Sequence, residues 1–118
     1  IEARKKKIVH VWGDGKQMRD FIHIDDCVRG VTRTMDKIND ATAINLSTGI
    51  FTSFIDFLKI GKKVSGNDFK IITKKSKPVG VFARAGSTYK QNKLGFKARI
   101  TLEQGIERGL RYYQNKII

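Results

Sequence analysis

The sequence has 118 residues, 40% of them apolar, and its 24 Lys and Arg outnumber its 11 Asp and Glu to give a formal net charge of +13. The apolar content and the single proline exclude a disordered chain, and the length allows one domain, which we expect to span residues 1–118. No apolar run approaches the roughly 20 residues that cross a bilayer, and one cysteine excludes an internal disulfide, so we expect a cytoplasmic protein with no membrane partner.

The first third of the chain predicts two strands, a glycine turn between them and then a helix. Residues 7–12 and 18–24 are strand-like, and the Asp-Gly step in residues 13–15 supplies the positive φ that a tight turn needs, so we expect a hairpin or a close pair of strands. Asp25 is expected to cap a helix over residues 26–38. Apolar residues recur there at helical spacing and predict one buried stripe, made of Cys27, Val28, Val31, Met35 and Ile38.

The rest of the chain alternates strands with helices. Residues 43–47, 69–73 and 79–83 are predicted to be extended, and Thr52 or Ser53 is expected to cap a helix that stops at Gly66.

Two further helices are predicted towards the C-terminus. A short one begins at Ser87 or Thr88 and stops at Gly95, and Thr101 with Gln104 forms a capping box for the last. The last helix has an apolar face made of Leu102, Ile106, Leu110, Tyr113 and Ile117. The pattern indicates an α/β fold.

Five short motifs occur in a fixed order along this chain. They are the Gly13-Asp14-Gly15 turn, Arg19-Asp20-Phe21-Ile22, Asp25-Asp26, Asn45-x-x-x-Gly49 and Leu94-Gly95-Phe96. In this order they resemble the NAD-dependent epimerase/dehydratase family, the extended short-chain dehydrogenases that act on nucleotide sugars. The resemblance covers residues 7–113 and belongs to the C-terminal, substrate-binding part of the family. Within the family it is nearest to the GDP-mannose 3,5-epimerases and then to the GDP-fucose synthases.

The resemblance implies a C-terminal portion of an extended short-chain dehydrogenase that lacks the N-terminal Rossmann nucleotide-binding part. It also implies that Arg19 and Arg84 approach the pyrophosphate of the substrate. A guanidinium is always charged and offers a planar fork of donors suited to phosphate oxygens. The alternative is structural: Arg19 would pair with Asp20 or Asp25, and Arg84 would be solvated. Many relatives have an aspartate three residues after the second arginine, where this chain has Ser87.

Two more residues are candidates for contact with the substrate. Asn45 resembles a position beside the substrate and cofactor cleft, although a buried asparagine that satisfies backbone groups would fit as well. Gln17 could touch the nucleotide or sugar, or it could be an exposed turn residue.

The sequence assigns no catalytic, cofactor-binding or metal-binding residue. Tyr89 with Lys93, and Tyr112 with Lys116, match the catalytic Tyr-x-x-x-Lys spacing of the family, but so many lysines make accidental matches common. The Gly13-x-Gly15 turn lacks the third glycine of a dinucleotide fingerprint.

The sequence therefore predicts the nucleotide-sugar-binding C-terminal part of an NAD(P)-dependent sugar epimerase or dehydratase, inactive on its own. Its expected partners are a nucleotide-diphospho-sugar and the missing Rossmann part, which would hold NAD or NADP, and the chain could self-associate. The alternative function is a basic domain that binds nucleic acid or another polyanion, since a charge of +13 attracts polyanions. Against it, the basic residues are spread along the chain without a nucleic-acid motif.

Overall fold

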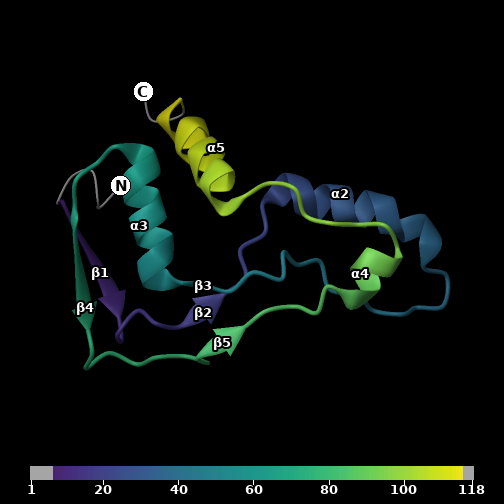
Figure 1. Cartoon of the computed structure of the whole chain (residues 1–118), viewed down its shortest axis with the longest axis horizontal. Helices are drawn as coiled ribbons and strands as arrows, with labels where there is room; N and C mark the ends of the chain where they lie inside the picture. Colours follow the sequence, from purple (N-terminus) through teal and green to yellow (C-terminus); the bar gives the residue numbers. More distant parts are fainter. Residues whose placement is uncertain (1–6, 116–118) are drawn as a thin grey trace.

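Two small sheets form the strand layer of this protein, of which the computed structural model describes residues 7–115 (Figure 1). In the first sheet, β1 (Ile8–Trp12) pairs in parallel with β4 (Lys70–Lys74). In the second, β2 (Met18–Arg19) lies between antiparallel β3 (Thr52–Ser53) and parallel β5 (Ala83–Arg84). The strands and helices alternate as the α/β pattern predicts.

The prediction that the first two strands form a hairpin or a close pair is wrong, because β1 and β2 belong to different sheets. Gly13 and Gly15 have positive φ values of 73° and 74°, so the turn itself is present. It carries the chain from one sheet to the other instead of folding β1 back on β2. A β-carbon on Gly15 would lie 2.5 Å from the Ile55 Cγ1, so a side chain there would collide with helix α3.

Residues 7–115 contain four α-helices. Helix α3 (Phe54–Ser65) lies beside the β1–β4 sheet, α5 (Leu102–Gln114) packs near α3, and α2 (Ile24–Thr34) lies with the short α4 (Tyr89–Lys93) at the other end of the molecule (Figure 1). A 3-10 turn, η1 (Met35–Lys37), extends α2.

The capping residues agree with the sequence at two helices. The Ser53 hydroxyl accepts the backbone N–H of Asp56 at 3.0 Å, and α3 ends at Gly66 with φ 64°. The Thr101–Gln104 capping box opens α5. The hydroxyls of Ser53 and Thr101 each accept a backbone donor that the helix leaves unpaired, and at α5 the Gln104 amide accepts a second one, which fixes where each helix starts.

Helix α2 departs from the expected cap. His23 is its N-cap, and its Nδ1 accepts the backbone N–H of Asp25 at 3.1 Å. The Asp25 carboxylate instead accepts a hydrogen bond from Arg108 of α5 at 3.0 Å. The prediction that Asp25 caps this helix is wrong because its side chain joins α2 to α5.

The predicted strand over residues 43–47 is absent. This segment has no regular structure and belongs to neither of the two described sheets. The predicted strand over residues 18–24 is shortened to two residues, because the Asp20 side chain bonds to the segment that follows residue 46. The segment predicted to be extended over residues 79–83 pairs with another strand only at its end, where β5 pairs with β2.

Three members of the apolar stripe that the sequence predicts as buried are exposed, which corrects the prediction for them, whereas Cys27 and Ile38 are partly covered. Exposed fractions are 55% for Val28, 51% for Val31 and 60% for Met35. No described residue covers this face of the helix. A large apolar surface left open in this way is typical of an interface.

The core is small and the molecule is flat. Phe96 is fully buried, and Val11 and Phe69 are the other apolar side chains buried among the described residues. The radius of gyration is 16.8 Å with extents of 50 × 36 × 18 Å, whereas a compact chain of this length would have a radius of about 13 to 14 Å. The predicted face of α5 is partly covered at Leu102, Ile106 and Leu110 but exposed at Tyr113, and Ile117 lies outside the described residues.

Candidate functional site

Arg19 and Arg84 occupy one register position of the parallel β2–β5 pair. Partners at one register position point to the same face of a sheet, so the structure brings together the two arginines that the sequence singles out. Like charges placed side by side on a sheet repel each other. A bound anion would remove that repulsion.

Backbone oxygens hold the Arg19 guanidinium. Its Nη1 donates to the carbonyl of Met18 at 2.7 Å and to that of Val81 at 2.9 Å. The guanidinium carbon lies 5.6 Å from the centre of the Phe54 ring. Among the described residues no acceptor meets Nε or Nη2, so donors remain for a ligand. The ion pair with Asp20 or Asp25 that the sequence left open is not formed.

Arg84 is exposed, and no hydrogen bond or ion pair of its side chain occurs within residues 7–115. Ser87, which stands where many relatives have an aspartate, contacts the backbone N–H of Tyr89 at 3.4 Å and leaves the arginine without an anionic neighbour. The solvated state that the sequence offered as an alternative is therefore the state of this side chain without a ligand.

The Asp20 carboxylate fastens a turn beside the arginines. It accepts hydrogen bonds from the Ser47 hydroxyl, the Thr48 backbone N–H at 3.0 Å, the Thr48 hydroxyl at 2.6 Å and the Gly49 backbone N–H at 2.7 Å. Burial would raise the pKa of Asp20, but these hydrogen bonds outweigh it and hold the pKa below the usual 3.8.

Asn45 lies in the same segment and is exposed, so the buried structural role considered for it is not realised. Its Cβ lies 2.9 Å from where a β-carbon on Gly86 would stand. Because Gly86 follows Arg84 by two residues, Asn45 stands near the end of β5 that carries the arginine.

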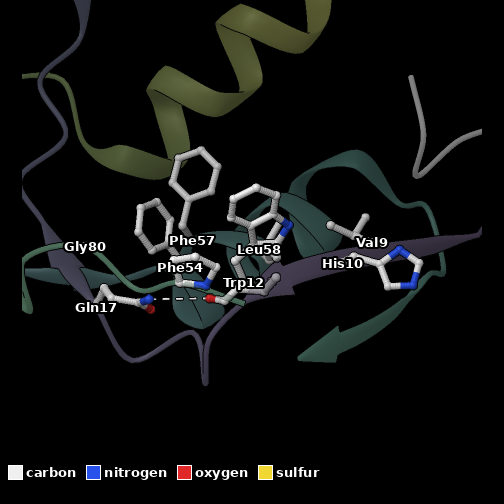
Figure 2. Close-up of a pocket in the computed structure, with 10 residues that line it drawn as sticks. Val9, His10, Trp12, Gln17, Phe54, Phe57, Leu58 and Gly80 are labelled. Carbon is white, nitrogen blue, oxygen red and sulfur yellow. Dashed lines mark hydrogen bonds between the residues drawn. The ribbon is translucent and has the colours of Figure 1, made fainter. Parts of the chain in front are cut away.

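An open cavity of about 450 Å³ lies between β1, α3 and the loop after β4 (Figure 2). Gln17 is buried at 6% exposure in its wall, and its Nε2 donates to the Trp12 carbonyl at 3.4 Å. The alternative considered from the sequence, that Gln17 is an exposed turn residue, is therefore wrong. The Gln17 Oε1 has no hydrogen-bond partner among residues 7–115. Phe54 and Gly80, which also line the cavity, flank Arg19.

The basic residues of α2 and η1 donate hydrogen bonds to backbone carbonyls. Arg33 donates to Gly95 at 2.9 Å, and Lys37 donates to Leu94 at 2.8 Å. Arg29 donates to the Lys97 carbonyl at 2.8 Å and lies over the Phe96 ring. These side chains hold the turn after α4 and do not form a free row of phosphate donors.

Comparisons with known proteins agree with this geometry. Residues 1–47 match the model of the NAD dependent epimerase/dehydratase family. A probable GDP-L-fucose synthase 1 of Oryza sativa subsp. japonica is 27% identical over 110 residues, which cover 93% of this chain and 34% of that protein. The crystal structure of UDP-glucose 4-epimerase with UDP-glucose from Thermotoga maritima matches at 26% identity with a TM-score of 0.87, covering 99% of this chain and 38% of that one.

A second solved structure is the GDP-mannoheptose C4 reductase of Campylobacter jejuni with NADP bound. It is 32% identical with a TM-score of 0.78 and covers 92% of this chain and 35% of that one.

The chain belongs to the NAD-dependent epimerase/dehydratase family. Its fold is that of the C-terminal portion of an extended short-chain dehydrogenase. This epimerase/dehydratase chain spans about a third of the length of the relatives it matches. The family assignment gives no support to the polyanion-binding alternative. The finer resemblance to GDP-mannose 3,5-epimerase stays a prediction.

The residues described in this family member do not form a dinucleotide cradle. Gly13 and Gly15 lead from β1 to β2 and do not open a helix, which a phosphate cradle requires. Structures of its neighbours hold NAD or NADP. Within residues 7–115 no three His, Cys, Asp or Glu side chains gather as metal ligands, and no helix there is long and apolar enough to span a bilayer.

Of the two Tyr-x-x-x-Lys matches, the structure describes only the first in full. The Lys93 ammonium lies 4.5 Å from the centre of the Tyr89 ring, a cation–π contact on the surface of α4. For the second match, Lys116 lies outside the described residues.

Sequence reasoning missed Asp20, Ser47 and Gln91 as parts of the site. Asp20 was considered as a motif residue and as a possible ion-pair partner of Arg19, but not as the residue that binds the turn over residues 47–49. Gln91 is 2% exposed and bonds both backbone groups of Ser47. The family motifs contained the signal for Asp20, but Gln91 lies in an ordinary polar helix sequence.

Proposed function

We propose that this chain is the substrate-binding part of an NAD(P)-dependent nucleotide-sugar epimerase, dehydratase or reductase, forming a single domain over residues 1–118. In this proposal Arg19 and Arg84 bind the diphosphate of the nucleotide sugar from adjacent strands. The observation that carries the proposal is their shared register position on one face of the sheet.

The fold supports a ligand at this place. The two arginines end parallel strands, and ligands of α/β sheets bind at the carboxyl ends of such strands. Relatives point to the ligand class: the Thermotoga maritima structure contains UDP-glucose, and other relatives are named GDP-L-fucose synthases. Asn45, beside the end of β5, would then face the sugar. Gln17 would contribute from the cavity wall next to Arg19.

In this proposal the oxidation and reduction of the sugar require the dinucleotide that relatives carry in the part of their chains that this one does not span. The role of the present residues is to bind and orient the substrate, so the 118-residue chain alone would have no epimerase or dehydratase activity. The exposed stripe of α2 would pack against that dinucleotide-binding part.

The test is a calorimetric titration of the chain with UDP and with GDP, with Arg84→Ala as the variant. Loss of a charged hydrogen bond should weaken binding about 10-fold, while the free energy of unfolding stays level or rises slightly because a like-charge contact is removed. Arg99→Ala is the matched control, because Arg99 is also exposed and lies between α4 and α5. Unchanged affinity in Arg84→Ala would overturn the proposal.

A further inference from the structure

The segment over residues 45–49 is held by side chains instead of by a backbone ladder. The backbone N–H of Ser47 donates to the Gln91 Oε1 at 2.8 Å, and the Gln91 Nε2 donates to the Ser47 carbonyl at 2.8 Å. An amide side chain that bonds both groups of one residue replaces the neighbouring strand that this segment lacks. Gln91 is 2% exposed, so water does not compete for these bonds.

Asp20 holds the same segment from the opposite side. Its carboxylate receives two backbone N–H groups, from Thr48 and Gly49, and two hydroxyls, from Ser47 and Thr48. Hydrogen bonds to an ionised carboxylate are about twice as strong as neutral ones. The segment is therefore fixed between β2 and α4, two elements far apart in the sequence.

The loop after β5 packs against this segment without space for a side chain. A β-carbon on Gly86 would lie 2.9 Å from the Asn45 Cβ and 3.1 Å from the Ser47 Cβ. Any residue other than glycine would push the segment away from β5. The position of Asn45 relative to the second arginine thus depends on this contact.

Both fixed points are next to the arginines along the chain. Asp20 follows Arg19 directly, and Gly86 follows Arg84 by two residues. A shift of the segment at either point would change the distance between Asn45 and the arginine pair, while each arginine would keep its own strand position.

We infer that Asp20 and Gln91 are positioning residues that hold the 45–49 segment across the ends of β2 and β5, and so place Asn45 against the sugar end of the bound nucleotide-diphospho-sugar. This inference rests on the proposed function. It predicts that loosening the segment weakens recognition of the sugar and spares recognition of the diphosphate.

The experiment compares the affinity of the chain for UDP-glucose with that for UDP, and for GDP-mannose with that for GDP. The variants are Gln91→Met and the double substitution Ser47→Ala with Thr48→Val, which leaves the backbone bonds to Asp20 in place. Thr32→Val is the matched control, since the Thr32 hydroxyl bonds only to carbonyls of its own helix. The ratio of the two affinities should fall about 5-fold or more in the variants, with the affinity for the nucleoside diphosphate within about 2-fold of wild type.

The possible outcomes distinguish a failure of the positioning role from a failure of the proposed function. Equal losses for both probes, an unchanged ratio in a cooperatively folded variant, or a wild-type ratio near one would overturn the positioning role alone. No binding of either nucleoside diphosphate to the wild type would overturn the proposed function and the positioning role with it. If Gln91→Met does not fold, the double variant gives the result, because it keeps the bonds from Gln91 to Ser47.

Discussion

The carboxylate of Asp26 accepts the backbone N–H of Ile100 at 2.8 Å and so fastens the first turn of α2 to the segment before α5. The same oxygen accepts the backbone N–H of Arg99 at 2.8 Å, and the other oxygen accepts from Arg29. Asp26 is 1% exposed. A buried carboxylate with this many donors makes a connection between distant parts of the chain that a small apolar core does not supply.

Asp26→Asn should lower the free energy of unfolding by about 3 kcal/mol, because an amide group would face a guanidinium or a backbone donor in a buried site. Urea denaturation followed by circular dichroism measures the change. Asp36→Asn is the control, since Asp36 is exposed in η1, and it should change stability by less than about 0.5 kcal/mol. Equal effects of the two substitutions would show that the buried hydrogen bonds contribute little.

Stability should fall in acid through Asp20 and Asp26. Burial would raise the pKa of each, but the hydrogen bonds they accept outweigh it and hold each pKa below the usual 3.8. A group with a lowered pKa in the folded state stabilises the fold above the unfolded value, and this contribution is lost as the pH falls from about 3.8 towards the folded pKa. Melting temperatures between pH 7 and pH 2 should show this acid loss, and Asp20→Asn should flatten it. A loss on raising the pH from 5 to 7 would contradict this assignment.

Substitution by alanine should change the stability of the fold in opposite directions at two helical glycines, Gly30 and Gly61. A β-carbon on Gly30 would lie 2.8 Å from the Leu46 Cδ2 and 3.0 Å from the Phe96 Cζ, whereas one on Gly61 would meet nothing within 4 Å. Gly30→Ala should destabilise the fold by about 1 to 2 kcal/mol through overpacking, and Gly61→Ala should stabilise it by up to about 1 kcal/mol through helix propensity. Thermal melts of the two variants check the sign of each change.

The exposed face of α2 should make the isolated chain self-associate. Ile24, Val28, Val31 and Met35 are each more than half exposed and share one face of the helix. The double substitution Val28→Glu with Val31→Glu should shift the chain towards monomer in sedimentation velocity, with little change in melting temperature because both positions are open. Lys59→Glu, at an exposed position on α3 and not on the α2 stripe, should leave association unchanged. A wild-type chain that sediments as a monomer at all concentrations would refute this prediction.

Local chemistry determined which elements could be predicted from the sequence. The caps of α3 and α5 and the turn at Gly13 and Gly15 follow from side chains or φ values within a few residues, and they were predicted correctly. Strand pairing depends on distant partners. The hairpin prediction failed because β1 pairs with β4, a strand that follows it by more than 50 residues.

In the candidate site, too, the features set by local sequence could be predicted and those set by distant partners could not. The ordered motifs predicted the family, and they singled out Arg19 and Arg84, which the fold places at one register position. The position of Asn45 depends on Gln91 and Asp20 through hydrogen bonds across the chain, and periodicity carries no information about such bonds. The stripe on α2 was predicted as buried because helical spacing identifies an apolar face but not whether another part of the protein covers it.

Arg19 should affect both binding and stability, unlike Arg84. Arg19→Ala would remove the hydrogen bond from the Arg19 Nη1 to the Val81 carbonyl, so we expect the free energy of unfolding to fall by about 1 kcal/mol. We also expect the affinity for UDP or GDP to fall about 10-fold or more. Arg19→Lys should recover only part of the affinity, because an ammonium keeps the charge but not the planar fork. Unchanged affinity with a lowered melting temperature would assign Arg19 a purely structural role.

Combining Arg19→Ala with Arg84→Ala tests whether both side chains bind one diphosphate. If they do, removal of the first arginine leaves the ligand less well ordered against the second, so the two losses of binding free energy should not add, and a coupling of about 0.5 kcal/mol or more should remain. Isothermal titration of the wild type, the two single variants and the double variant with GDP and with UDP measures this coupling. The pair Arg19→Ala with Arg99→Ala is the control and should be additive, since Arg99 lies beyond α4, away from the β2–β5 pair. Additive losses for Arg19 and Arg84 would mean that the two arginines act on separate groups of the ligand, in which case their shared register position would not constitute a diphosphate clamp.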